Sequence, residues 1–316
     1  MDVFASLQRV LKICQNHARN AFVARRPTLP EPTSFPKAYR RLERIVLTEG
    51  VVGTLFDDFD RHRETARGEE EFGWVLLGVR EETEAVVLAA LPAGAQRHAS
   101  LTHIQFHSNA QTVATRWLRQ TDKRLAMLGV AHTHPGSMRH PSGGDYRGDI
   151  QFVARLRGRE GVFAIGTADA SFPETVTSSE PHRHGRGSLC MTWYALAEGD
   201  PQYRKIPIAT IAGDDLARPL AGVWPTLDTH ADGLERLCQQ LNGGQFGVTA
   251  AGLSFAVPLA DDRRRLRVLL EGPQIRYYVE DEGNLLVVDP EAVTLEQGIY
   301  AILAELARRR LPDAAP

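Results

Sequence analysis

Cysteines and long apolar runs are scarce in this chain of 316 residues, and each scarcity excludes a class of protein. The three cysteines are too few and too scattered for the disulfide framework of a small secreted domain. No apolar run approaches the roughly 20 residues that a membrane-spanning helix needs. The apolar stretch at the N-terminus is interrupted by Arg9 and Lys12, unlike a signal peptide. We therefore expect a cytoplasmic protein without a membrane partner.

The charges of the chain are nearly balanced. Lysine and arginine total 37, aspartate and glutamate total 39, and the formal net charge is -2. A chain without a basic excess is poorly suited to a phosphate backbone, so we expect no nucleic-acid partner. Hydrophobic residues make up 43% and charged residues 24%, which is the mix of a folded globular protein. The length allows more than one hydrophobic core.

Prolines and a change in the order of predicted elements divide the chain into four parts. Apolar residues spaced three and four apart over 4–24 predict an amphipathic helix, and a proline-rich linker completes residues 1–39. Residues 40–204 alternate predicted strands and helices, and residues 205–228 form a connector. Residues 229–316 predict a helix, three or four antiparallel strands and a last helix. The N-terminal helix and the C-terminal domain are both candidates for binding a protein partner.

Within the second part, the patterns predict helices packed on a sheet. Two apolar runs separated by a charged turn predict a hairpin over 74–91. Asn109 is the expected N-cap of a helix with a clean apolar stripe. A further helix is expected over 149–156, and the polar stretch 169–188 is expected to be a long loop.

The residues most informative about function are His132-Thr-His134-Pro135 and a following Ser142-x-x-Asp145. Two histidines two positions apart at the end of a predicted strand leave the same face of an extended backbone. Asp145 follows a loop rich in proline and glycine, which allows the chain to fold back towards the histidines. Asp145 then adds a carboxylate oxygen. Two nitrogens and one oxygen fit the open three-ligand site of a hydrolytic zinc, so we expect Zn²⁺ on His132, His134 and Asp145.

A hydrolytic metal site also needs a proton acceptor and a donor for the oxyanion. Glu71 is our candidate general base, because it lies just before an apolar run predicted to be a neighbouring strand. The alternative interpretation is that Glu71 and its neighbours Glu69 and Glu70 form an ordinary run of solvated glutamates. Ser142, three residues before Asp145, can donate its hydroxyl to the oxyanion of a tetrahedral intermediate.

Together these residues resemble the JAMM (MPN+) zinc metalloproteases, and among them the prokaryotic JAB-domain branch. The shared elements are an upstream glutamate at Glu71, then His132-Thr-His134-Pro135, then Ser142-x-x-Asp145, in the order and spacing of the family. One departure is Gly73-Trp74, where the family often has a glycine pair. We expect this change to alter packing near the site and to leave catalysis intact.

The resemblance implies an α/β fold of the JAB/MPN type over residues 40–204, a curved mixed β-sheet flanked by helices, with a smaller α+β domain after it. It also implies hydrolysis of the peptide or isopeptide bond after the C-terminus of ubiquitin or a ubiquitin-like protein. The partner would then be a ubiquitin-like protein or its conjugates. The sequence leaves two alternatives open: a peptidase that processes a sulfur-carrier-like protein, and a non-catalytic MPN scaffold.

Other histidines raise the question of a second metal site. His182, His184 and Cys190 lie close together in the sequence, but no fourth ligand accompanies them. His140 lies inside the loop before Asp145, and we expect it to be exposed to solvent because the ligand set is complete without it.

Three arginines are candidates for contact with the substrate. Arg97, Arg183 and Arg186 lie in segments where the family carries substrate-binding insertions. We hypothesise that they meet an acidic surface of the substrate, and the sequence assigns no other substrate-binding residue.

Overall fold

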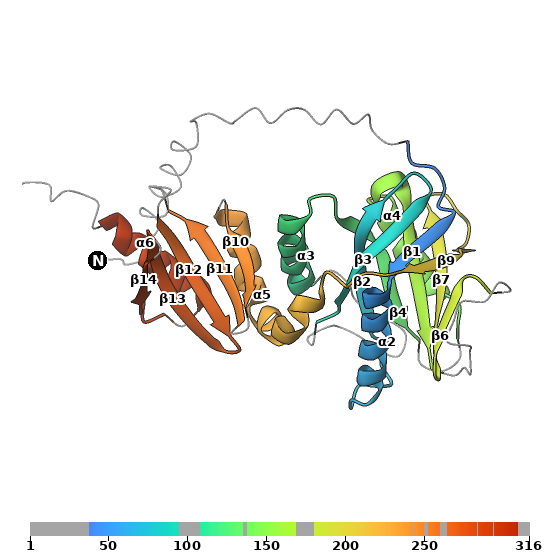
Figure 1. The fold of residues 1–316 in the computed structure, drawn as a ribbon, viewed down its shortest axis with the longest axis horizontal. Helices are drawn as coiled ribbons and strands as arrows, with labels where there is room; N and C mark the ends of the chain where they lie inside the picture. Colours follow the sequence, from blue (N-terminus) through green and yellow to red (C-terminus); the bar gives the residue numbers. More distant parts are fainter. Residues whose placement is uncertain are drawn as a thin grey trace, which may run out of the picture. The chain divides into compact units, whose positions relative to one another are not determined.

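The computed structural model describes residues 38–94, 108–134, 138–168, 180–241, 243–249, 252–259, 264–282, 284–292 and 294–308. The chain forms two compact units (Figure 1). The large unit is Pro36–Ala231, and the small unit includes Asp232–Pro316. The helix predicted over 4–24 and its linker lie outside the described residues. No helix of the described parts is long and apolar enough to span a membrane.

The large unit is built on one mixed sheet, in the order β6-β7-β5-β4-β2-β3-β1-β9, with β8 paired to β7. The parallel pairs are β1 with β3, β1 with β9, and β4 with β5. The other pairs are antiparallel. The strands are β1 (Arg44–Thr48), β2 (Gly73–Arg80), β3 (Glu84–Pro92), β4 (Ala126–Thr133), β5 (Glu160–Thr167), β6 (Arg183–Arg186), β7 (Leu189–Ala197), β8 (Arg204–Lys205) and β9 (Ile208–Ile211).

Helices flank this sheet, as expected for an α/β fold (Figure 1). They are α2 (Glu49–Arg63), α3 (Asn109–Thr121) and α4 (Gly143–Val153), with short 3-10 turns η1 (Arg157–Arg159) and η2 (Arg218–Val223). Helix α5 (Trp224–Gln240) begins in the large unit and ends in the small one. Phe56 of α2 joins Trp74, Leu76 and Trp193 in a core that is almost fully buried. Shifts of register beside Leu77 in the pairings of β2 curve the sheet.

Several elements differ from the sequence-based expectations. The N-cap of α3 is Ser108 rather than Asn109, because Ser108 and Gln111 form a reciprocal capping box. Helix α4 begins after Ser142, earlier than the expected 149–156. Part of the expected loop 169–188 forms β6, which pairs with β7. The expected connector 205–228 supplies β9 to the sheet, where β9 pairs with β1 and buries Ile208 but leaves Ile211 exposed.

The small unit is a five-stranded antiparallel meander in the order β10-β11-β12-β13-β14. This is one or two strands more than predicted. Its elements are β10 (Gln245–Thr249), β11 (Gly252–Pro258), β12 (Arg264–Glu271), β13 (Gln274–Asp281), β14 (Asn284–Val288) and α6 (Leu295–Arg308). A capping box between Thr294 and Gln297 starts α6. Gly298 of α6 packs directly on Tyr277, where an added Cβ would lie 2.1 Å from the hydroxyl oxygen.

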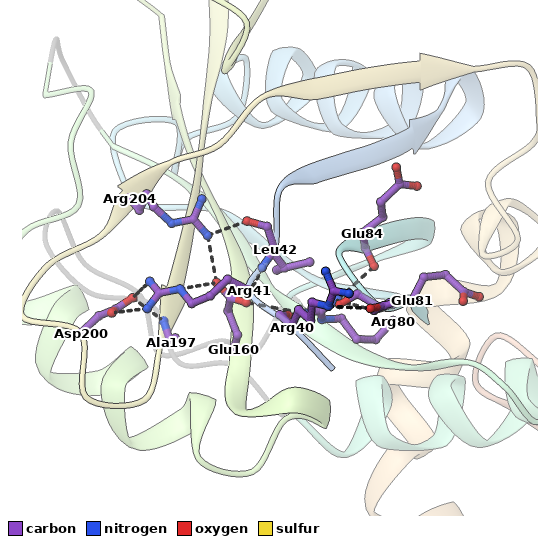
Figure 2. A network of polar contacts seen from close by, with 11 residues as sticks. Arg40, Arg41, Leu42, Arg80, Glu81, Glu84, Glu160, Ala197, Asp200 and Arg204 are labelled. Atoms are coloured by element: carbon purple, nitrogen blue, oxygen red, sulfur yellow. Dashed lines mark hydrogen bonds and ion pairs between the residues drawn. The ribbon is translucent and has the colours of Figure 1, made fainter. Parts of the chain in front are cut away.

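A buried ion pair ties the start of β5 to the end of β2 (Figure 2). Arg80 and Glu160 are 3% and 4% exposed, and Arg80 Nη2 lies 3.4 Å from Glu160 Oε2. The same carboxylate accepts from the Leu42 backbone N–H at 2.6 Å and from Arg204 at 3.0 Å. Arg80 also donates to the carbonyl of Arg40 at 2.5 Å. Burial lowers the pKa of Arg80, and the charge of Glu160 opposes that shift.

Helix α4 rests on a cluster of aromatic side chains. The ring of Tyr203 lies 5.5 Å from Phe163 and 6.2 Å from Tyr146 of the helix. The hydroxyl of Tyr203 donates to Asp149 Oδ2 at 2.7 Å. Burial raises the pKa of Asp149 to about 7, although the bond from Tyr203 favours the ionised form. These contacts fix the helix that carries Asp145.

We predict that Glu160→Ala lowers the free energy of unfolding of the large unit by about 3–5 kcal/mol, because it leaves Arg80 buried without its counter-charge. Glu82→Ala is the matched control, because Glu82 pairs with Arg40 in an exposed ion pair. The control should cost about 0–1 kcal/mol. Urea unfolding followed by tryptophan fluorescence measures both, and equal losses would contradict the prediction.

We also predict that Asp149 makes the stability of the large unit fall as the pH rises. The pKa of this carboxyl is raised from 3.8 to about 7 in the fold. Its neutral form is therefore favoured, and its stabilising contribution is complete below the unfolded pKa and lost as the pH passes about 7. Asp149→Asn keeps an acceptor for Tyr203 and removes the titration. Urea unfolding from pH 5 to 8 should give the variant a flatter profile than the wild type, and parallel profiles would refute the assignment.

Candidate metal centre

The two motif histidines lie at the end of β4, where three strands meet. His132 pairs in register with Gly73 of β2 on one side and with Ile165 of β5 on the other. The backbone N–H of His134 donates to the carbonyl of Gly166 at 2.8 Å. Both side chains are buried. Pairing on both sides of the strand thus holds the imidazoles in place.

Asp145 reaches the histidines from the first turn of α4. The Ser142 side chain accepts from the Asp145 backbone N–H at 3.1 Å, and the Asp145 carboxylate accepts from the Ser142 N–H at 2.5 Å. The Ser142-x-x-Asp145 spacing is therefore a capping box, in which each residue satisfies the other's backbone donor. An acidic residue in the first helical turn is also favoured by the helix dipole.

These three side chains converge, as predicted. The Nε2 atoms of His132 and His134 lie 3.0 Å apart, and each lies 3.4 Å from an oxygen of Asp145. Among the residues that the structure describes, they are the one group of three or more potential ligands found together. Ligands about 2.0–2.1 Å from a tetrahedral zinc lie about 3.3 Å from one another, so these separations fit a metal.

The protonation states also suit a ligand set. Burial lowers the pKa of His132 below its usual value, although its hydrogen bond with Asp145 opposes the shift. Burial also works against charge on His134, but its bonds with Asp145 and Met138 outweigh burial and raise its pKa. Burial disfavours the carboxylate of Asp145, yet the bonds with both histidines lower its pKa overall. Asp145 is thus ionised, as a metal ligand must be.

A carbonyl outside the motif orients one of the histidines. His134 Nδ1 lies 2.9 Å from the Met138 oxygen, so this nitrogen carries the proton and Nε2 is left as a donor to a metal. Tyr194 supports the same loop, because its hydroxyl donates to the Arg139 carbonyl at 2.7 Å. His140 is exposed, as expected, and lies 3.1 Å from that hydroxyl. The sequence gives no signal for Met138 or Tyr194, since a carbonyl has no residue preference.

Glu71 lies beside the histidines because its neighbour is bonded to β4. The Phe72 N–H donates to Thr133 Oγ1 at 2.9 Å, and the Thr133 N–H donates to the Phe72 carbonyl at 2.7 Å. Glu71 is 3% exposed, and its Oε2 has no hydrogen-bond partner among the described residues. Burial raises its pKa to about 7, with the charge of His134 lowering and that of Asp145 raising it. The preceding run of glutamates is thus not a uniformly solvated face.

The remaining candidates are engaged elsewhere. His184 contacts the ring of Phe56 edge-on at 5.5 Å, and Cys190 is buried within β7. Neither joins a metal-binding group with His182 among the described residues. Arg183 pairs with Glu180, and Arg186 lies 2.7 Å from Asp57, so both already have acidic partners within the chain. The predicted contact of Arg97 falls outside the described residues.

Comparison with known proteins bears on the same part of the chain. Residues 54–175 match the family described as prokaryotic homologs of the JAB domain. Among solved structures, the chain is similar to a protein from Desulfitobacterium hafniense whose structure was determined in solution, with 17% identity, coverage of 54% of this chain and 94% of that chain, and a TM-score of 0.37. No curated protein matches the chain. The family match lies within the large unit, and it is to the family that the histidine, serine and aspartate motif of this chain resembles.

Proposed function

We propose that the JAB domain is a zinc-dependent peptidase or isopeptidase that cleaves after the C-terminus of a ubiquitin-like protein. The observation that carries this proposal is the convergence of His132, His134 and Asp145 next to the buried carboxylate of Glu71. JAB domains include metallo-isopeptidases, and a member that serves only as a scaffold has no need of a complete ligand set. The presence of the complete donor set in one place favours catalysis over a scaffold role.

The donor set fits zinc. Two imidazole nitrogens and one carboxylate oxygen leave the fourth position of a tetrahedral site open for a reactant. Asp145 Oδ2 accepts from the Ser142 N–H, so Oδ1 is the oxygen that can turn to a metal without breaking the helix cap. Zinc bound there would act as a Lewis acid and lower the pKa of water from about 15.7 towards about 7.

Glu71 would serve as the proton carrier. Its unpartnered Oε2 can take a proton from the attacking water and pass it to the leaving amine. Burial excludes bulk water from this carboxylate and keeps its pKa near 7, where it can both accept and donate a proton.

Ser142 would have two roles at once. Its oxygen already accepts from the Asp145 N–H, which holds the ligand in place. Its own hydroxyl hydrogen is not used in that bond and is available to a developing oxyanion. The same side chain would thus support both the metal centre and the transition state.

An extended C-terminal tail is the substrate that this site would suit best. A ubiquitin-like tail can add as a strand beside an existing sheet and be held by main-chain hydrogen bonds. This mode of binding does not require any particular side chain in the tail. Conjugates and precursors share the bond after that tail, and a sulfur-carrier-like protein would present the same type of end. Comparing such substrates separates these cases.

We predict that Glu71→Gln abolishes cleavage and leaves zinc bound. The amide keeps the size of the side chain but accepts no proton, so kcat should fall by about 10²–10⁴. The measurement uses ubiquitin-like proteins with C-terminal extensions, and a sulfur-carrier-like protein with the same extension, with metal content determined on the same samples. Glu69→Gln is the matched control, because Glu69 lies in the same acidic run.

The outcomes of this comparison are distinct. Equal cleavage by wild type and Glu71→Gln would show that the base is another residue. Wild-type protein that holds zinc stoichiometrically but cleaves none of the substrates would support a scaffold instead. Wild-type protein that contains no zinc after purification and takes up none on reconstitution would refute the proposal altogether.

We further predict that Ser142→Ala destabilises the large unit and weakens zinc binding. Loss of an N-cap costs about 0.5–2 kcal/mol, and loss of support for a ligand typically weakens metal affinity about 10–100-fold. Ser142→Asn supplies a capping oxygen without the hydroxyl. It should recover stability and zinc affinity while cleavage stays impaired. Full recovery of cleavage by Ser142→Asn would exclude the hydroxyl from the reaction.

A further inference from the structure

The large unit contains a cavity of about 1010 Å³ that is separate from the candidate metal centre. Its walls include residues of helix α2, the end of β3, and residues 213–225 around η2. The three candidate metal ligands are not among the described residues that line it. Sites for small molecules typically enclose roughly 300–1,000 Å³, so the cavity is large enough for such a ligand.

A buried carboxylate lines this cavity and has one oxygen without a partner. Asp215 is 2% exposed. Its Oδ1 accepts from the backbone N–H of Ala217 at 2.8 Å and from that of Ala90 at 3.4 Å. Its Oδ2 has no hydrogen-bond partner among the described residues. Burial raises the pKa of Asp215 to about 6, although hydrogen bonds from Thr54 and the two N–H groups oppose the shift. Such a carboxylate is costly to bury unless a donor or a cation reaches it.

The arginines of the cavity wall do not neutralise this carboxylate. Arg61 and Arg67 pair with other carboxylates, at 3.1 Å and 2.5 Å. Arg218 is exposed, and within the described parts of the chain no ion pair joins it to Asp215. The negative charge of Asp58 adds to the rise in the pKa of Asp215. The site therefore lacks a positive charge that a ligand could supply.

The rest of the wall adds a hydrogen-bond donor and apolar surface. The indole Nε1 of Trp224 is buried, and it too has no hydrogen-bond partner in the described parts. Phe72, Leu91 and Leu220 also line the cavity. Apolar walls with a few placed polar groups are the usual form of a small-molecule site. A matching ligand carries a cation for Asp215, an acceptor for the indole and an apolar body.

We propose that this cavity binds a small organic cation, in which a primary ammonium or guanidinium group is attached to an apolar body with an oxygen acceptor. The cation bonds to Asp215, and the oxygen accepts from the Trp224 N–H. The exposed carboxyls of Glu49 and Asp214 also line the cavity and attract a cation to it. A metal ion suits the cavity less well, because the described residues form no group of three potential ligands there. The proposal does not depend on hydrolysis at the metal centre.

Calorimetric titration of the full-length protein with tyramine tests this proposal. Tyramine joins an ammonium group to a phenol, and desaminotyrosine carries a carboxylate on the same body. Argininamide is the guanidinium probe. We expect both cations to bind saturably and desaminotyrosine not to bind.

Removal of the charge of Asp215 should weaken this binding. Asp215→Asn keeps an acceptor for the Ala217 N–H, and it should weaken both cations about 10–100-fold, as expected for a hydrogen bond to a charged group. Asp60→Asn is the matched control, because it removes the same charge from an exposed position of α2 that does not line the cavity. Its affinity for tyramine should equal that of the wild type.

A second variant fills the cavity without changing a charge. Gly53 of α2 lines the cavity, and a Cβ added there would meet no atom within 4 Å. Gly53→Leu should therefore fold normally and abolish tyramine binding. Gly148→Leu is its control, because an added Cβ also meets no atom within 4 Å there and this position of α4 does not line the cavity. Thermal unfolding of each variant shows that it is folded.

Several outcomes would overturn the proposal. They are equal binding of desaminotyrosine and tyramine, wild-type affinity for the cations in Asp215→Asn, retained binding in Gly53→Leu, and no saturable binding of either cation. A lysine-containing peptide that binds where both free cations fail would assign the cavity to a protein partner, and the small-molecule site would be refuted.

Discussion

The reciprocal hydrogen bonds between Ser142 and Asp145 are the interaction on which the candidate metal centre depends. They start helix α4 at one defined residue and hold the Asp145 carboxylate towards two histidines on a different element. Strand pairing fixes the histidines independently. The centre is therefore assembled from a strand end and a helix start, each stabilised by its own backbone hydrogen bonds.

Local signals in the sequence were enough to predict the residues of this site but not the way they are held. The spacing of His132 and His134 predicted two candidate donors that do lie together with Asp145, and the glutamate before a strand predicted a candidate base whose role stays a prediction. The start of α4 was missed because Gly143 and Gly144 disfavour a helix, and the capping box that offsets this cost is visible only once the motif is considered as a helix start. Tyr203, which supports α4, is 54 residues from Asp149 and no local pattern connects the two.

The two strands that the sequence analysis missed lie at the ends of the large sheet. Strand β6 is four residues of mostly polar sequence, and β9 follows a proline, so neither shows the apolar alternation of a strand. Strand β9 is specified by pairing with β1, which is distant in the sequence, whereas β6 pairs with the adjacent β7 but is too short and too polar for its sequence to predict a strand. Hairpin strands β2 and β3 were predicted because their partner is adjacent. Sequence patterns therefore predicted the centre of the sheet better than its edges.

Electrostatics explains why the centre is suited to a divalent cation. Among the described residues, no lysine or arginine is paired with either Glu71 or Asp145, although both carboxyls lie beside the histidines. Glu160, another buried carboxylate of this unit, is surrounded by arginines, whereas the buried carboxylate of Asp215 accepts from the backbone N–H groups of Ala217 and Ala90. Burying a carboxylate without a counter-charge is costly. Guanidinium groups neutralise Glu160, whereas only imidazoles lie beside Glu71 and Asp145, so this second site still lacks positive charge. A bound dication would meet that need, with two imidazoles and one carboxylate as its ligands.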